Sequence, residues 1–265
     1  MPAELRSRWA LCKYFPMDRR VWAAIILSVV FFGCGRSKEQ SAPAYTVQEL
    51  PGSVVEGRVR LQGTPPPPKR IQLAQDVDVC GETREVYSVR VENGGVDDAV
   101  VWIDDIQGGK AFSFPPAQIS QKNCTYLPHV VLMQVGDVSI TSQDPIPHSV
   151  HTHGQHNRDY NESMSSLQHD ILLSFLRPDV ISVRCDLHGW MQAYVVVAKN
   201  PYYAISENGG RFKLDGVPKG HYHLKVWSES LGENEQEIVV EVGKPTRADF
   251  TLKIQTAQTS GANQP

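Results

Sequence analysis

The chain has 265 residues, of which 41% are hydrophobic and 21% charged, as is ordinary for a folded globular protein of one or two domains. Its formal net charge is -3, and the sequence contains no long Lys/Arg run. Composition therefore gives no reason to expect a nucleic acid or another polyanion as a partner.

The N-terminus carries a short apolar run. Arg19 and Arg20 precede thirteen apolar or small residues, 21–33, which end directly at Cys34. A membrane-spanning helix needs about 20 apolar residues, so residues 1–33 are predicted to be a secretory signal peptide. The position of Cys34 resembles that in bacterial lipoprotein signals, where the cysteine is lipidated. The resemblance implies a protein anchored to a membrane through a lipid, facing the periplasm or the cell exterior. An ordinary signal peptide or an uncleaved anchor is the alternative.

Polar segments flank the part that we expect to fold. Residues 34–51 are predicted to be a flexible tether. Residues 255–265 are predicted to be a disordered tail. Met17 is an alternative start, because the signal pattern is clearer without residues 1–16.

Short β-branched runs recur between turn signals, which predicts an all-β fold made of β-sandwiches. Asn93-Gly94-Gly95 is a hairpin signal. Residues 159–170 lack a strand pattern, and a helical or irregular insert is expected there. The predicted strands are 54–61, 87–91, 99–103, 129–134, 137–141, 180–184, 194–198, 211–214, 222–227, 237–242 and 248–252.

The C-terminal strands carry a family pattern. SENGGRF at 206–212 and VPKGHY at 217–222 resemble carboxypeptidase regulatory-like modules, which are small prealbumin-type β-sandwiches. The usual opening of such a module occurs far upstream, as EGRV at 56–59 and VVWI at 100–103. The resemblance implies a discontinuous sandwich, 52–107 with 200–254, into which a second domain, 108–199, is inserted. Three consecutive β pieces are the alternative. The insertion predicts contacts of Val59, Leu61, Val101 and Ile103 with Phe212, Leu214, Leu224 or Val226.

The strongest chemical signal is CDLHGWM at 185–191. It places a thiolate, an imidazole and a thioether within seven residues, between two predicted strands. Soft sulfur ligands with imidazole suit copper, and a His2Cys site with a weak axial Met is the blue-copper arrangement. A second imidazole is needed, and His148 in PIPHSV at 145–150 supplies it.

Residues 115–198 resemble the cupredoxins, and the short ligand loop is most similar to that of amicyanin. The resemblance implies one mononuclear type 1 copper ion held by His148, Cys185, His188 and Met191. Ser149 departs from the pattern, because cupredoxins commonly carry an Asn there that helps to lock the Cys loop. The segment 151–176 has no obvious counterpart in the family. The alternatives are a chance grouping of core residues, or zinc, for which Met is a poor ligand.

The proposed metal centre leaves two cysteines and three nearby histidines to be explained. With Cys185 assigned to metal and Cys34 to lipid, Cys80 and Cys124 are predicted to form a disulfide in an oxidising compartment; two free thiols are the alternative. A His-rich run offers an auxiliary metal site or, alternatively, a solvated loop. That run adds His151, His153 and His156 to His148.

The ligand set predicts an electron carrier rather than an enzyme, because four protein ligands leave no open position for a substrate. Redox proteins would be the donor and acceptor. His188 would be the electron portal, and Trp190 would be either a docking residue beside it or part of the core. The alternatives are a copper-binding or delivery lipoprotein, or a non-redox structural or carbohydrate-contacting module.

Overall fold

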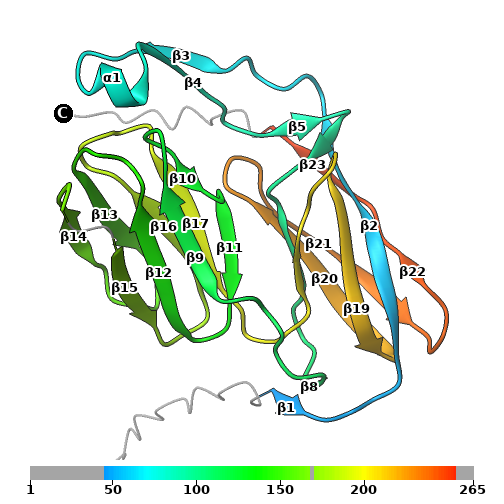
Figure 1. The fold of residues 1–265 in the computed structure, drawn as a ribbon. Coiled ribbons are helices and arrows are strands. Elements are labelled where there is room, and N and C mark those ends of the chain that lie inside the picture. The colour runs from blue at the N-terminus through cyan, green and yellow to red at the C-terminus, as the bar shows by residue number, and fades with distance from the viewer. Residues whose placement is uncertain (1–44, 168–169, 255–265) are drawn as a thin grey trace, which may run out of the picture. The chain divides into compact units, whose positions relative to one another are not determined.

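The computed structural model describes residues 45–167 and 170–254. In these ranges the only helix is the short α1, Val77–Cys80, and the other regular elements are strands (Figure 1). The predicted all-β fold is confirmed. No helix within these ranges has the length and hydropathy that a membrane crossing requires. The predicted signal peptide, Cys34 and the predicted tail lie outside the described residues.

Two sheets that enclose one core form the first sandwich, called sandwich A. One sheet has the order β10-β9-β12-β15 and the other β11-β17-β16-β13-β14. β11 pairs with β17, and β9 with β12, in parallel, whereas the other pairs are antiparallel. The strands are β9 (Ala117–Gln121), β10 (Tyr126–Leu127), β11 (Val130–Met133), β12 (Gly136–Ser142), β13 (His148–His153), β14 (Asn161–Met164), β15 (Asp170–Phe175), β16 (Asp179–Arg184) and β17 (Gln192–Val197).

The second sandwich, called sandwich B, also has two sheets. Their orders are β18-β7-β20-β21 and β19-β2-β6-β5, and β22 and β23 also pair with β2. The strands are β2 (Gly52–Gln62), β5 (Val91–Glu92), β6 (Gly95–Val96), β7 (Val100–Ile103), β18 (Tyr203–Ile205), β19 (Arg211–Pro218), β20 (Gly220–Ser228), β21 (Gly232–Val240), β22 (Thr246–Arg247) and β23 (Phe250–Lys253).

Sandwich B joins strands that precede sandwich A in the chain to strands that follow it. β2 pairs with β19, and β7 pairs with β20 so that Ile103 faces Leu224 and Val101 faces Val226. These four side chains are buried in one core, because alternate residues of each strand point to the same face of its sheet. The predicted long-range contacts of Val101 and Ile103 are therefore present, and Val59 and Leu61 belong to the same core or pack against it. The limits of the two domains stay a prediction.

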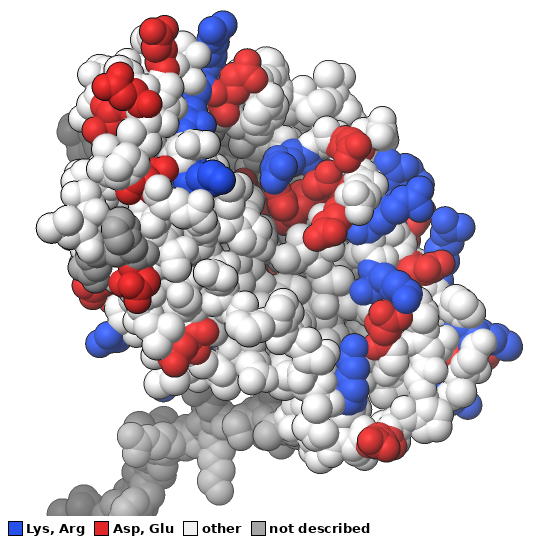
Figure 2. All heavy atoms as spheres, in the orientation of Figure 1, with Lys and Arg blue, Asp and Glu red and all other residues white. Residues whose placement is uncertain are grey.

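Charged side chains are mixed on the surface. On the face in Figure 2, Lys and Arg are interspersed with Asp and Glu. That face therefore has no extended surface of one charge. Lys225 in β20 likewise lies within 3.6 Å of carboxylate oxygens of Asp104, Glu233 and Glu235.

Three local predictions need correction. The predicted tether is held from Tyr45 onward, because β1 (Thr46–Val47) pairs in parallel with β8 (Gly108–Gly109). The predicted strand 87–91 is reduced to its last residue in β5, since residues 87–90 pair with no strand. The expected helical or irregular insert 159–170 contains strand β14 instead, which pairs with β13 and extends the sheet.

Sequence analysis also missed α1 and the hairpin around it. β3 (Lys69–Gln72) pairs with β4 (Thr83–Val86), and α1 lies between them. Leu73 and Cys80 of this segment are buried in the core of sandwich A. The hairpin lies beside one end of that sandwich (Figure 1), although its residues fall within the range predicted for sandwich B.

Candidate metal centre

The predicted ligands come from two neighbouring strands and the loop that follows them. His148 is the first residue of β13, and Cys185 directly follows β16, which pairs with β13. His188 and Met191 lie in the loop between β16 and β17. The Met191 amide donates to the His188 carbonyl at 2.8 Å, and the Cys185 amide donates to the Met191 carbonyl at 3.3 Å. These bonds close the loop at the end of the sheet.

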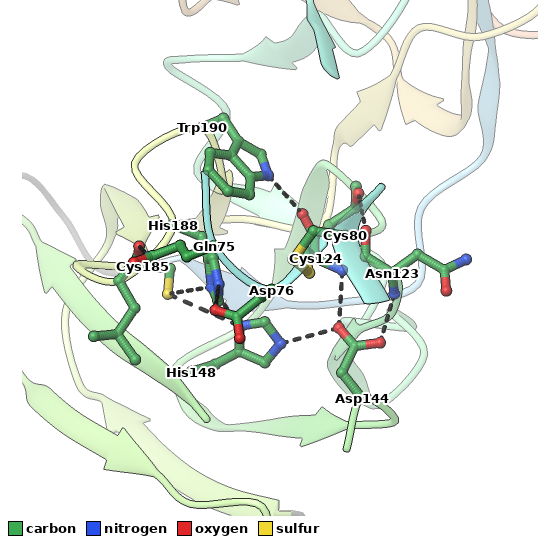
Figure 3. Close-up of a disulfide and its surroundings, with 12 residues drawn as sticks. Gln75, Asp76, Cys80, Asn123, Cys124, Asp144, His148, Cys185, His188 and Trp190 are labelled. Atoms are coloured by element: carbon green, nitrogen blue, oxygen red, sulfur yellow. Dashed lines mark hydrogen bonds and ion pairs between the residues drawn. A yellow bond between two sulfur atoms is a disulfide. The ribbon is translucent and has the colours of Figure 1, made fainter. Parts of the chain in front are cut away.

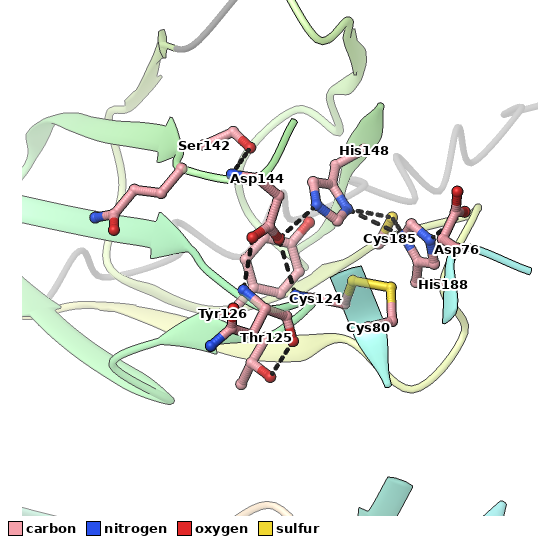
Figure 4. A network of polar contacts seen from close by, with 12 residues as sticks. Asp76, Cys80, Cys124, Thr125, Tyr126, Ser142, Asp144, His148, Cys185 and His188 are labelled. Carbon is pink, nitrogen blue, oxygen red and sulfur yellow. Dashed lines mark hydrogen bonds and ion pairs between the residues drawn. A yellow bond between two sulfur atoms is a disulfide. The ribbon is translucent and has the colours of Figure 1, made fainter. Parts of the chain in front are cut away.

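The side chains of three predicted ligands converge (Figure 4). His148 Nδ1 lies 3.0 Å from His188 Nδ1, and Cys185 Sγ lies 4.0 Å and 3.7 Å from these two nitrogens. All three residues are at most 2% exposed. Met191 is also 2% exposed and is part of the same core.

The outer nitrogens of both imidazoles face carboxylates. His148 Nε2 lies 2.9 Å from Asp144 Oδ2, and His188 Nε2 lies 3.1 Å from Asp76 Oδ2. A carboxylate accepts hydrogen bonds, so each of these contacts favours the tautomer with the proton on Nε2, which leaves Nδ1 free to bind a metal ion. Both Nδ1 lone pairs then point inward at each other, which is favourable when a cation lies between them. Carboxylates on the outer nitrogens are typical of histidines that bind metals.

The spacing of the donor atoms also fits a metal ion. Zn²⁺, a metal ion of comparable size, binds imidazole nitrogen at about 2.0–2.1 Å and thiolate sulfur at about 2.3 Å. Two nitrogens can therefore share an ion when they are up to about 4.1 Å apart, and a nitrogen and a sulfur up to about 4.4 Å. All three distances are below these limits. A thiolate with two imidazoles is a donor set that suits copper.

Ser149 connects β13 to the ligand loop. Its amide donates to Cys185 Sγ at 3.4 Å, and its hydroxyl oxygen accepts a hydrogen bond from the Asp186 amide at 2.7 Å. Its hydroxyl also lies 3.8 Å from Cys185 Sγ. Both hydrogen bonds fix the start of the ligand loop to the neighbouring strand.

The surroundings of Cys185 favour the thiolate, which is the form that binds metal. Burial is the largest single influence and raises its pKa. The contacts from His148, from the Ser149 amide and hydroxyl and from the His188 amide together outweigh burial and lower the pKa to about 6. The pKa of His148 is raised, because its contacts with Cys185 and Asp144 outweigh the lowering by burial.

Sequence reasoning missed two of the residues that support the ligands. Asp144 is 3% exposed and accepts hydrogen bonds from the amides of Asn123 at 2.6 Å and Cys124 at 2.8 Å. Its place four residues before His148 is a local signal that could have been used. Asp76 is 112 residues from His188, and no spacing in the sequence indicates their contact.

The predicted disulfide between Cys80 and Cys124 is formed. The ligand-forming atoms of both cysteines lie within 4.8 Å of the His188 ring nitrogen. These sulfurs are engaged with each other. Among the described residues, His148, Cys185 and His188 are therefore the only group of three close donors without a disulfide cysteine.

The structure does not unite the predicted auxiliary histidines into one site. The rings of His151 and His153 lie 4.1 Å apart, and His151 Nδ1 is 3.0 Å from Asp186 Oδ1. His156 is in the loop that follows, where its amide donates to Asp179. Within the described residues, no group of three close donors includes any of these histidines. The auxiliary site stays a prediction.

His188 and Trp190 were predicted to serve electron transfer. Trp190 is half-buried, its ring centroid lies 5.1 Å from that of His188, and its Nε1 donates to the Cys124 carbonyl at 3.1 Å. His188 is 1% exposed and does not itself reach the surface. Electrons that use His188 must pass through the atoms that cover it, and its portal role stays a prediction.

Comparisons with known proteins support parts of this description. The model of the carboxypeptidase regulatory-like domain matches residues 190–253. The match covers β18 to β23 of sandwich B but begins within the ligand loop and includes β17, which pairs in sandwich A. No curated protein sequence matches the chain.

Similar solved structures are copper proteins, and the similarity is weak. A Cu-containing nitrite reductase from Thermus scotoductus SA-01 has 17% identity over 34% of this chain and a TM-score of 0.29; the chain spans only 24% of that protein. A Cu(I) mutant of amicyanin has 18% identity over 31% of this chain and 82% of its own, with a TM-score of 0.29. A purple cupredoxin from Nitrosopumilus maritimus has 21% identity over 31% and 99% of the two chains, with a TM-score of 0.27. The case for a metal centre comes from the geometry of the site itself.

Proposed function

We propose that this protein is an exported, lipid-anchored electron carrier with one type 1 copper ion held by His148, Cys185, His188 and, as a weak axial ligand, Met191. The observation that carries the proposal is the convergence of Cys185 Sγ and two inward-facing Nδ1 atoms within 4.0 Å of one another. This donor set matches the blue-copper arrangement.

Copper held there would supply a one-electron couple between Cu(I) and Cu(II). The protein contributes a rigid, dry site. Asp144 fixes the His148 ring, Ser149 ties the ligand loop to β13, and the main-chain bonds at Met191 close the loop. Ligands that stay in place when the copper ion gains or loses an electron keep the reorganisation energy of electron transfer low. Preorganised polar groups in enzyme sites reduce reorganisation in the same way. Four protein ligands would leave no open position for a substrate, so the proposal includes no enzymatic reaction.

A copper-delivery role would need donors that are open and easily exchanged. The three convergent donors are instead at most 2% exposed, which favours a carrier. Delivery would also use the His-rich run as a loading site, which requires its histidines to be accessible together. His148 is buried while His153 is exposed. The carrier is therefore the function that we propose.

The spectrum of the copper-loaded protein tests the proposal. With Cu(II), the protein should be coloured by a Cys185 thiolate charge-transfer band, and Cys185→Ser should abolish the colour. Met191→Leu should keep most of the colour and raise the potential, because a weak axial ligand is lost. Met133→Leu is the matched control, since Met133 is buried in the same core but outside the ligand set. A colourless wild-type protein under oxidising, copper-replete conditions would sink the proposal.

The lipid anchor is tested separately. Cys34→Ser should release the protein from the membrane fraction or block its processing, whereas Cys12→Ser, in the predicted signal, should leave both unchanged. Mass spectrometry of the mature N-terminus reports the result. A mature chain that begins elsewhere and carries no lipid would contradict the anchor and leave the copper proposal untouched.

A further inference from the structure

Residues 69–86, called the arm, lie over the ligand loop of sandwich A. Within the arm β3 pairs only with β4, so neither strand belongs to a sheet of sandwich A. Leu73 and Cys80 are nonetheless buried in the core of that sandwich, and Ile71 and Val79 pack against it. The arm therefore attaches to the metal centre by side chains and not by a shared sheet.

Asp76 is the arm residue that contacts a predicted ligand. Its Oδ2 lies 3.1 Å from His188 Nε2, and its side chain is 35% exposed whereas that of His188 is 1% exposed. Asp76 therefore covers the outer side of the imidazole, and Figure 3 shows it beside His188. Asp76 also has a left-handed backbone, with φ of 53° and ψ of 28°, which is uncommon for a residue other than glycine. Such a conformation persists only where the surrounding structure holds it.

Three sets of contacts hold Asp76 in this place. Its carbonyl accepts hydrogen bonds from the amides of Val79 at 3.0 Å and Cys80 at 2.8 Å, which form the turn of α1. Gln75 Nε2 donates to the carbonyl of Leu187 in the ligand loop at 3.0 Å. The disulfide fixes the end of α1 to Cys124.

Cys124 in turn is tied to both sides of the metal centre. Its amide donates to Asp144 Oδ2, the oxygen that faces His148, and its carbonyl accepts from Trp190 Nε1. The disulfide thus links the carboxylate on the outer nitrogen of one imidazole to the segment that bears the carboxylate on the other (Figures 3 and 4).

We propose that Asp76 is a positioning residue of the metal centre: it holds His188 with the proton on Nε2 and Nδ1 free, and the Cys80–Cys124 disulfide keeps it in place. For the effect on copper, this inference rests on the proposed function. Carboxylates on the outer nitrogen of a ligating His fix the ring and make it more basic, and their loss costs 10–100-fold in metal affinity. The negative charge also favours Cu(II) over Cu(I), so removing it should raise the potential.

The first experiment uses the metal-free full-length protein, with nitrogen-15 NMR of the His188 ring at constant pH. Wild-type His188 should be in the Nε2-protonated form, and Asp76→Ala should shift it toward a mixture of both tautomers. Asp76→Glu should restore the wild-type form. Asp78→Ala is the matched control, because Asp78 is an exposed acid on the same turn. An Asp76→Ala protein with the wild-type tautomer would overturn the proposal.

The second experiment measures Cu(II) affinity by competition with a chelator. Asp76→Ala should weaken binding at least tenfold and Asp78→Ala less than twofold, and a twofold or smaller loss for Asp76→Ala would count against the positioning role. The NMR result does not depend on copper. A colourless wild-type protein would therefore defeat the proposed function and leave the role of Asp76 to be decided by the tautomer.

The disulfide part is tested in the Cys80→Ala/Cys124→Ala double variant, again without metal. The rate at which iodoacetamide modifies Cys185, followed by mass spectrometry of its peptide, reports whether the arm still covers the loop. The modification rate should rise at least tenfold over the wild type. The double variant should also show the His188 tautomer mixture expected for Asp76→Ala, and adding Asp76→Ala to it should change that mixture no further. An unchanged rate in a folded double variant would refute the disulfide's role. Methyl signals of the buried Met133 and Met164 report whether sandwich A is folded.

Discussion

Replacing Asp144 tests how much the buried carboxylate beside His148 contributes to sandwich A. The carboxylate accepts three hydrogen bonds, from the amides of Asn123 and Cys124 and from His148 Nε2. In Asp144→Ala all three donors lose their partner. Asn123 is an exposed residue, so its amide can bind water, whereas the Cys124 amide and the His148 ring are buried.

The magnitude follows from the two donors that stay buried. Leaving a buried donor unsatisfied costs about 1–3 kcal/mol, so Asp144→Ala should destabilise sandwich A by about 2–6 kcal/mol. Asp144→Asn should cost less, about 1–2 kcal/mol, because a neutral hydrogen bond is weaker than one to a charged acceptor. The amide oxygen can still face Cys124 and His148, and its NH2 group would then face the amide that water can reach. Asp144→Ala should therefore destabilise sandwich A more than Asp144→Asn does.

Urea unfolding of the metal-free protein, followed by methionine methyl signals, measures this order. Three of the five methionines, Met133, Met164 and Met191, are buried in the core of sandwich A and report its unfolding alone. Asp170→Ala is the control, because Asp170 is exposed on the edge strand β15 and should change stability by less than about 0.5 kcal/mol. A loss below about 1 kcal/mol for Asp144→Ala, or equal losses for Ala and Asn, would refute the reasoning.

Three further predictions concern other parts of the molecule. Leu224→Ala removes a fully buried neighbour of Ile103 and should destabilise sandwich B by about 2–5 kcal/mol in urea unfolding. The charge-transfer band of the proposed copper centre should not change. Loss of that band would contradict separate cores for the two sandwiches. Burial lowers the pKa of His129, but the contact with Glu229, the charge of Asp98 and the bond to the Gln192 carbonyl together outweigh burial and raise this pKa above 6.5. This pair should therefore stabilise the protein fully below pH 6.5 and less as the pH rises through the raised value, and His129→Gln should flatten that part of the urea-midpoint profile. In the metal-free protein the Cys185 thiolate, followed by its ultraviolet absorbance, should form with a midpoint near pH 6; a midpoint near 9 would show that its contacts do not act as described.

Local patterns in the sequence were sufficient for several features. The β-branched runs predict an all-β fold because a pleated strand repeats every two residues, and the burial of Val138 and Ile140 in β12 follows that repeat. Cys185, His188 and Met191 are close because one short loop carries them. The pairing of Cys80 with Cys124 followed from assigning the other cysteines to different roles.

Local patterns failed where a segment depends on a partner elsewhere in the chain. Residues 46–47 have a polar, tether-like context, yet they form a strand because Gly108 and Gly109 offer a free edge. Residues 161–164 have little strand pattern, but β13 provides hydrogen-bond partners and makes them β14. Propensity is a weak guide at such edges, because the neighbouring strand decides the conformation.

The sequence by itself determined the identities of the donor atoms, the order of the ligands and the alternation that builds the sheets. Only the tertiary structure decided what surrounds the ligands. Asp76 reaches His188 across 112 residues of chain, and Ser149 reaches the Asp186 amide across 37. Those contacts depend on how two sheets and the arm pack in space, and hydrogen bonding between distant residues leaves no periodic trace in a single sequence. The proposed ligands can therefore be identified from the sequence, whereas the carboxylates beside them and the arm that covers them became apparent only in the folded protein.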